Sequence, residues 1–179
     1  MTQDEHSGHP RGGRRQEGAA GMSTTAQALA DQFDKLNEEL IAAITVCSDA
    51  QWQATCAADG RQTGVLAYHL ARIHGRIASM LHKAVSGSAF QPVTMDQIEQ
   101  ENAQDMVEHA HCTTDEVLAL LQSNGAAAAS IVRDLDEDQL RKPATLLAFT
   151  PPMTVEQAIE HVLIGHAQGH IASLRAALS

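Results

Sequence analysis

A chain of 179 residues is long enough for one domain with a hydrophobic core and short for two. Hydrophobic residues make up 44% of it but aromatic ones only 3%, a balance typical of closely packed helices rich in alanine and leucine. The formal net charge of −10, with no basic stripe in the sequence, argues against a nucleic-acid partner.

The sequence carries no signal for membrane insertion or export. No apolar run approaches the roughly 20 residues that cross a bilayer, and the N-terminus lacks the apolar centre of a secretion signal. The three cysteines, Cys47, Cys56 and Cys112, follow no metal-ligand spacing and are typical of a reducing compartment. We therefore expect a cytoplasmic protein with no membrane partner.

Residues 1–22 differ in composition from the rest of the chain. They are rich in glycine, arginine and charge and show no apolar period, so they cannot bury enough surface to offset the entropy of ordering them. We expect a disordered N-terminal extension at 1–22, with His6 and His9 solvated, and one domain over 23–179.

Four segments show the apolar spacing of amphipathic helices, at 23–47, 63–85, 114–135 and 155–178. The third and fourth are preceded by capping pairs, Thr113 with Glu116 and Thr154 with Gln157. All prolines lie outside these segments, which leaves the helices unbroken. The pattern predicts an all-α fold, a four-helix bundle with a long crossover between the second and third helices.

The crossover lies between residues 86 and 113. Thr94 and Gln97 in it can cap a short extra helix. The alternation of apolar and polar residues that is typical of strands is absent from the whole sequence.

The fourth segment contains HVLIGHAQGHIASL, in which His166 and His170 are four residues apart and so share one helix face. The face is apolar, and an imidazole buried there needs a partner for its ring nitrogens. A metal ion is one such partner, and a hydrogen bond in the core is another. The spacing alone does not decide between them, because ten histidines in 179 residues often produce such a pair by chance.

The second segment adds a further histidine. His69 borders its apolar stripe and can look into the bundle, whereas His74 lies about 140° further round the helix and is expected to face solvent. The remaining histidines of the domain are expected at its periphery or in solvent: His82, His109, His111 and His161.

The phrases AYHLARIHGRI and HVLIGHAQGHIASL, in this order, resemble the DinB/YfiT-like family of bacterial four-helix bundles. Trp52 before the second helix and DEDQL before the fourth match as well, and the resemblance covers about 24–178. It implies a divalent metal ion held by His69, His166 and His170, with zinc or nickel foremost and iron or manganese as alternatives. Arg61 and Gln62 are a departure, because relatives often have a tryptophan and a hydroxyl residue there.

Three imidazoles leave a divalent ion with an open position, as in catalytic zinc sites. The resemblance implies a thiol-dependent S-transferase that uses mycothiol, bacillithiol or glutathione, with maleylpyruvate isomerase a related case. A metal-dependent hydrolase and a non-catalytic metal-binding or structural bundle are the alternatives. A small-molecule substrate and a homodimer are further expectations.

No catalytic or thiol-binding residue can be assigned from the sequence. Glu108, Glu116 and Glu160 are candidates for a base only by their closeness in the chain to the suspected site, and each fits a solvated face as well. Cys112 is considered as a fourth ligand because it lies in the crossover.

Gly165 and Gly169 each precede a suspected ligand, and a glycine within a helix costs about 1 kcal/mol relative to alanine. We favour a close approach between helices as the reason, with room for a ligand as the alternative.

Overall fold

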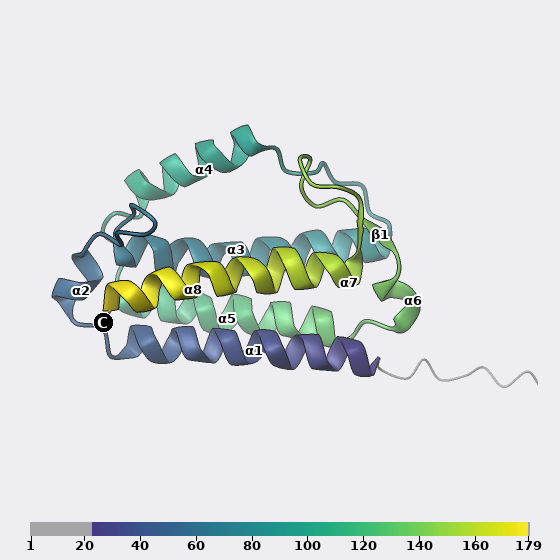
Figure 1. Ribbon diagram of the computed structural model, residues 1–179, viewed down its shortest axis with the longest axis horizontal. Helices are drawn as coiled ribbons and strands as arrows, with labels where there is room; N and C mark the ends of the chain where they lie inside the picture. The colour runs from purple at the N-terminus through teal and green to yellow at the C-terminus, as the bar shows by residue number, and fades with distance from the viewer. Residues whose placement is uncertain (1–22, 179) are drawn as a thin grey trace, which may run out of the picture.

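The computed structural model describes residues 23–178, so the extension expected at 1–22 lies outside the described residues. Four long helical segments lie side by side (Figure 1). They are α1 (Thr24–Thr45), α3 (Thr63–Ser86), α5 (Thr114–Arg133) and a C-terminal segment formed by α7 (Val155–Ala158), the π-helix η1 (Ile159–Ile164) and α8 (Gly165–Leu178). The predicted four-helix bundle is confirmed. The connections contain shorter elements: α2 (Asp49–Gln53), α4 (Met95–Glu108), α6 (Glu137–Leu140), β1 (Pro143–Ala144) and β2 (Met153–Thr154).

The capping pairs mark helix starts as predicted, because they satisfy free N–H groups of the first turn. The Thr113 hydroxyl accepts from the Glu116 N–H, and the Glu116 carboxylate accepts from the Thr113 N–H at 2.8 Å. Thr154 and Gln157 form the same reciprocal pair where α7 begins.

The crossover between α3 and α5 is built around α4. Helix α3 ends at Gly87, whose φ of 72° lies in the left-handed region that glycine enters at low cost. Thr94 and Gln97 form a capping box at the start of α4, so the extra helix is confirmed. Figure 1 shows α4 on the opposite side of α3 and α8 from α1.

A small hairpin closes one end of the bundle. Strands β1 and β2 pair antiparallel, with Pro143 opposite Thr154 and Ala144 opposite Met153. The backbone of Val93 bonds the loop between them, accepting from Ala148 N at 2.8 Å. Strands of two residues are too short to show an alternating pattern, which explains why the sequence does not predict them.

Trp52 fixes the connection between α1 and α3. Its side chain is buried, and its Nε1 donates to the carbonyl oxygen of Cys112 at 2.9 Å. A Cβ on Gly64 would lie 2.7 Å from the Trp52 ring, so the missing side chain lets the indole lie against the first turn of α3. The indole therefore links the connection before α3 to Cys112 by a hydrogen bond and to the first turn of α3 by its contact at Gly64.

The C-terminal segment changes its hydrogen-bond pattern in η1. The N–H of Gly165 bonds the carbonyl of Glu160, five residues earlier. A π-helix holds more residues per turn than an α-helix, so side chains after it are rotated relative to those before it. His166 and His170 follow directly, which makes η1 the element that sets their direction.

None of the helices described is long and apolar enough to cross a membrane.

Candidate metal centre

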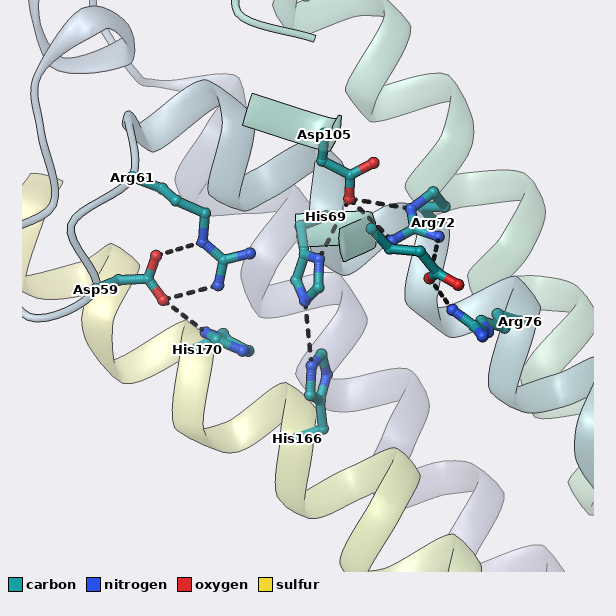
Figure 2. A network of polar contacts seen from close by, with 9 residues as sticks. Asp59, Arg61, His69, Arg72, Arg76, Asp105, His166 and His170 are labelled. Atoms are coloured by element: carbon teal, nitrogen blue, oxygen red, sulfur yellow. Dashed lines mark hydrogen bonds and ion pairs between the residues drawn. The ribbon is translucent and has the colours of Figure 1, made fainter. Parts of the chain in front are cut away.

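Three histidines from two helices converge where α3 and α8 lie side by side (Figure 2). His69 comes from α3, and His166 and His170 come from successive turns of α8. One ring nitrogen of each lies within 4.8 Å of those of the other two, and His69 Nε2 is 3.4 Å from His166 Nε2. Over residues 23–178, this is the one group of His, Cys, Asp or Glu side chains close enough together to hold a metal ion.

Two carboxylates face the opposite nitrogens of two of these rings. Asp59 Oδ2 lies 3.3 Å from His170 Nδ1, and Asp105 Oδ2 of α4 lies 3.5 Å from His69 Nδ1. The second contact is at ion-pair distance and lacks hydrogen-bond geometry. A carboxylate beside Nδ1 favours the tautomer with its proton there, which leaves the Nε2 lone pair free for a metal.

Two arginines hold these carboxylates in turn. Arg72 donates to Asp105 Oδ2 through Nε at 3.1 Å and Nη2 at 2.9 Å, and it also contacts Glu101. Arg61 donates to Asp59 through Nε and Nη2, the second bond at 2.8 Å. These hydrogen bonds hold each carboxylate in position beside its imidazole.

The environment keeps the three imidazoles neutral. Burial is the largest cause, and it lowers the pKa of His69 to about 2 and that of His166 to about 3. Burial also lowers the pKa of His170, and the positive charge of Arg61 acts on all three pKa values in the same direction. Neutral imidazole is the form that binds metals, so no proton has to leave these rings at neutral pH.

This donor set fits a divalent metal ion. The Nε2 atoms of His69 and His166 face each other at 3.4 Å, and the Nδ1 of His166 is buried with no hydrogen-bond partner among the described residues. A cation at the convergence point would take a lone pair from each ring, with the proton of each imidazole on its other nitrogen. Imidazole ligands suit zinc, nickel and iron, and three of them leave at least one position open.

A cavity of about 570 Å³ adjoins the histidines, a size typical of small-molecule sites. Helices α3, α4 and α8, the element η1 and the hairpin contribute to its walls. All three histidines line it. Its apolar lining consists of Ile73, Ile77, Met80, Val93, Ile98, Leu147, Met153 and Val162.

The expectation that His74 faces solvent is wrong. His74 is 1% exposed, and its ring meets that of Phe33 edge-on, with centroids 4.9 Å apart. Helix α3 contacts α4, α5 and α8, so most of its surface is covered. A residue outside the apolar stripe, such as His74, is therefore buried as well.

The remaining histidines of the domain lie outside the cluster. His82, His111 and His161 are exposed as expected, although His161 also lines the cavity. His109 is half-buried rather than solvated, because its ring stacks on Tyr68 with centroids 3.6 Å apart.

The carboxylates and the cysteine considered from the sequence are not in the cluster. Glu108 and Glu160 are exposed, and Glu116 serves as the cap of α5. Cys112 offers its carbonyl oxygen to Trp52, and its thiol is not among the grouped donors.

A close approach between helices does not explain the two glycines before the ligands. A Cβ on Gly169 would meet nothing within 4 Å. A Cβ on Gly165 would meet only the Glu160 carbonyl of its own helix, at 3.3 Å, and Gly165 lines the cavity. The alternative, room beside the histidines, agrees with the structure at Gly165.

Sequence reasoning misses Asp59 and Asp105 and treats Arg61 only as a departure from relatives. The signal available for Asp59 and Arg61 is the phrase ADGR, a turn with an acid and a base on either side of a glycine. Gly60 there has a φ of 86°, so the turn depends on glycine. Asp105 carries no comparable signal, because its role follows from how α4 crosses the bundle.

Comparison with known proteins supports the same fold. The family model of the mycothiol maleylpyruvate isomerase N-terminal domain matches residues 33–168. Among solved structures, YfiT from Bacillus subtilis, described as a probable metal-dependent hydrolase with an unusual four-helix bundle topology, matches with a TM-score of 0.72. The match covers 90% of each chain at 18% identity, a level that shows the shared fold. The comparison with curated proteins gives no match.

The resemblance to DinB/YfiT-like bundles is thereby confirmed. Because the matched residues make up most of its length, the chain belongs to the mycothiol maleylpyruvate isomerase N-terminal domain family.

Proposed function

We propose that this protein is an enzyme that holds a divalent metal ion through His69, His166 and His170 and acts on a small molecule in the adjoining cavity. The observation that carries the proposal is the convergence of three neutral imidazoles, within 4.8 Å, on the wall of that cavity. Zinc or nickel is the expected metal, with iron or manganese as alternatives.

Bound there, the metal would lower the pKa of a coordinated thiol or water. The chain's own residues prepare the site for this. Asp59 and Asp105 orient the rings of His170 and His69, and Arg61 and Arg72 orient the carboxylates. The mostly apolar walls would lower the local dielectric constant around a bound substrate, which strengthens charge interactions there.

The first candidate reaction is S-transfer with a low-molecular-weight thiol such as mycothiol, bacillithiol or glutathione. Among the described residues that line the cavity, Glu101 is the one carboxylate, and it is paired with Arg72 and Arg76. A metal-bound thiol loses its proton without a separate base, so S-transfer requires no free carboxylate in the cavity. The family's name, which includes a mycothiol enzyme, also supports it.

The second candidate is metal-dependent hydrolysis. It is supported by the open position of a three-histidine site and by the description of YfiT. It requires a proton acceptor for water, for which Glu101 would have to leave its arginines.

Metal content tests the proposal first. Elemental analysis measures the metal content of protein purified without added metal and of the same protein after incubation with zinc or nickel. The triple variant His69→Ala, His166→Ala, His170→Ala is measured in the same way. The matched control is the double variant His82→Ala, His111→Ala, which removes exposed histidines. We expect about one divalent ion per chain in the parent and control and none in the triple variant, with circular dichroism showing that all three fold. A parent that takes up no metal contradicts the proposal.

Activity assays then separate the candidates. Consumption of each thiol in the presence of an electrophile measures transfer, and acid release from esters and amides measures hydrolysis. Full metal occupancy with no turnover in either set would favour the non-catalytic metal-binding alternative.

A further inference from the structure

One side of the Arg61 guanidinium has no hydrogen-bond partner within residues 23–178. Arg61 is 9% exposed, and its Nε and Nη2 both donate to Asp59. Its Nη1 is buried and meets no acceptor among the described residues. A buried cationic donor without an acceptor is costly, so a position that retains one indicates a binding role.

The direction of this nitrogen is fixed by the surrounding contacts. The Arg61 carbonyl accepts from Cys56 N at 2.8 Å, which closes the turn around Gly60. Asp59 Oδ2 contacts both Arg61 Nη2, at 2.8 Å, and His170 Nδ1, at 3.3 Å. One carboxylate oxygen therefore sets the position of the guanidinium relative to the histidine cluster.

Arg61 Nη1 faces the cavity beside that cluster. Figure 2 shows the nitrogen that is not bonded to Asp59 turned away from it and toward His69. Arg61 lines the same cavity as His69, His166 and His170. An acceptor bound by Nη1 would therefore lie next to the three imidazoles.

The charges of this region favour an anionic acceptor. The cavity's other two arginines are engaged, Arg72 with Asp105 and Glu101 and Arg76 with Glu101. Together with Asp59, the carboxylates balance the three arginines, so a divalent metal ion would leave the region positive. A bound anion offsets that excess.

Away from the histidines the lining of the cavity is mostly apolar, apart from Arg72 and Arg76, which are paired with Glu101. From His69 to Met80 its wall follows α3 for eleven residues, about 16 Å at the rise of an α-helix. Ile77 and Met80 line this part on α3, Ile98 lines it on α4, and Val162 lines it on η1. An occupant that contacts both parts has a charged head and an apolar body.

We propose that the substrate is an organic acid with an apolar body, whose carboxylate is bound by Arg61 Nη1 and whose body lies along α3 toward Met80. A single free guanidinium nitrogen suits one carboxylate oxygen, whereas a phosphate dianion calls for several donors. This names the substrate class for the function proposed above and rests on that function.

Binding of three probes that share one chain length tests the assignment. Isothermal titration calorimetry of the full-length, zinc-loaded protein compares octanoate, octan-1-ol and octylamine. We expect octanoate to bind at least about tenfold more tightly than octan-1-ol, because a charge-assisted hydrogen bond is added, and octylamine to bind most weakly. Equal affinities for octanoate and octan-1-ol, or no binding of octanoate, would overturn the inference without recourse to any variant.

Matched arginine variants locate the carboxylate. Arg61→Gln is expected to weaken octanoate binding at least about tenfold and to leave octan-1-ol within about threefold. Arg76→Gln removes the same charge from the same cavity, but none of the Arg76 nitrogens is both buried and without a partner among the described residues, so its octanoate affinity should stay within about threefold of the parent. Equal losses in the two variants would overturn the assignment to Arg61.

Metal content, measured on the same samples, distinguishes a failure of the proposed metal-dependent function from a failure of the proposed substrate class. A parent that binds no metal contradicts the proposed function. A parent that binds metal but holds octanoate independently of Arg61 contradicts only the substrate class.

Discussion

Asp105 contacts the candidate metal centre through His69, so its effect on metal binding can be separated from that of a proposed ligand. Asp105→Asn removes the charge that holds the His69 proton on Nδ1 and also weakens the bond from Arg72. Metal affinity is expected to fall about 10- to 100-fold, the usual effect of a carboxylate behind a metal-binding histidine. Competition with a chelator measures it. Glu108→Gln, an exposed change on the same helix, is the control, and equal affinities in both variants would contradict the role of Asp105.

His74 makes stability depend on pH, although it is not one of the three clustered histidines. Burial lowers its pKa to about 4, and neither of its ring nitrogens has a hydrogen-bond partner in the described part of the chain. The unfolded chain, with a histidine pKa of about 6.5, takes up the proton first as the pH falls. The free energy of unfolding therefore decreases below about pH 6.5, by about 1.4 kcal/mol per pH unit from this residue.

His74→Leu removes that contribution. Between pH 8 and pH 5 the variant should lose about 2 kcal/mol less of its unfolding free energy than the parent. Urea denaturation of metal-free protein at both pH values checks this, with the exposed His82→Leu as control. The same pH dependence in all three proteins would show that the pKa of His74 is the same in the folded and unfolded states.

At the scale of single residues, the sequence predicts the three histidines that meet and not the groups that orient them. His69, His166 and His170 lie on periodic helices and match a family pattern, so their direction can be inferred. Asp59 and Asp105 lie on a turn and on the crossover helix, and their contacts depend on how these pieces fold over α3. Periodicity carries no information on such contacts.

Among the elements, α1 and α5 approach each other where a side chain is missing. A Cβ on Gly125 would lie 2.2 Å from the side-chain nitrogen of Asn37, a buried group that donates to Leu121 O at 3.2 Å. Gly125→Ala is therefore expected to lower the free energy of unfolding by about 1 kcal/mol or more, even after the gain in helix propensity.

Gly169→Ala is the matched opposite case. Its Cβ would meet nothing within 4 Å, so only the propensity gain remains, up to about 1 kcal/mol of added stability. Chemical denaturation of both variants decides the pair. Stabilisation of both by alanine would mean that α1 and α5 can separate at Asn37 without cost.

The helices could be predicted more closely than the pieces between them. Side chains at fixed spacing define both the stripe and the capping pairs, as at Thr113 and Thr154. The hairpin at Pro143–Ala144 could not, because strands of two residues are too short to show an alternating pattern. The π-helix at Ile159–Ile164 could not either, because no side-chain cap marks its start.

For the whole molecule, a metal ion would join α3 to the C-terminal segment, since its ligands come from both. Zinc at about 100 times its dissociation constant should raise the free energy of unfolding by about 2.7 kcal/mol, because it binds the folded chain and not the unfolded one. Differential scanning calorimetry with zinc and with a chelator measures the shift. The triple histidine variant should show none, and an equal shift in it would indicate binding elsewhere.

Homodimerisation stays a prediction.

The π-helix has a consequence for how such a site can change. One residue more or fewer in η1 turns everything after it by about 100° without altering the apolar contacts of Val155 and Ala158 before it. His166 and His170 would swing together and keep their mutual spacing. Because Ala167, Ile171 and Leu174 of α8 are buried in the core and would turn with the histidines, the length of η1 sets the direction of His166 and His170 and the apolar face of α8 together.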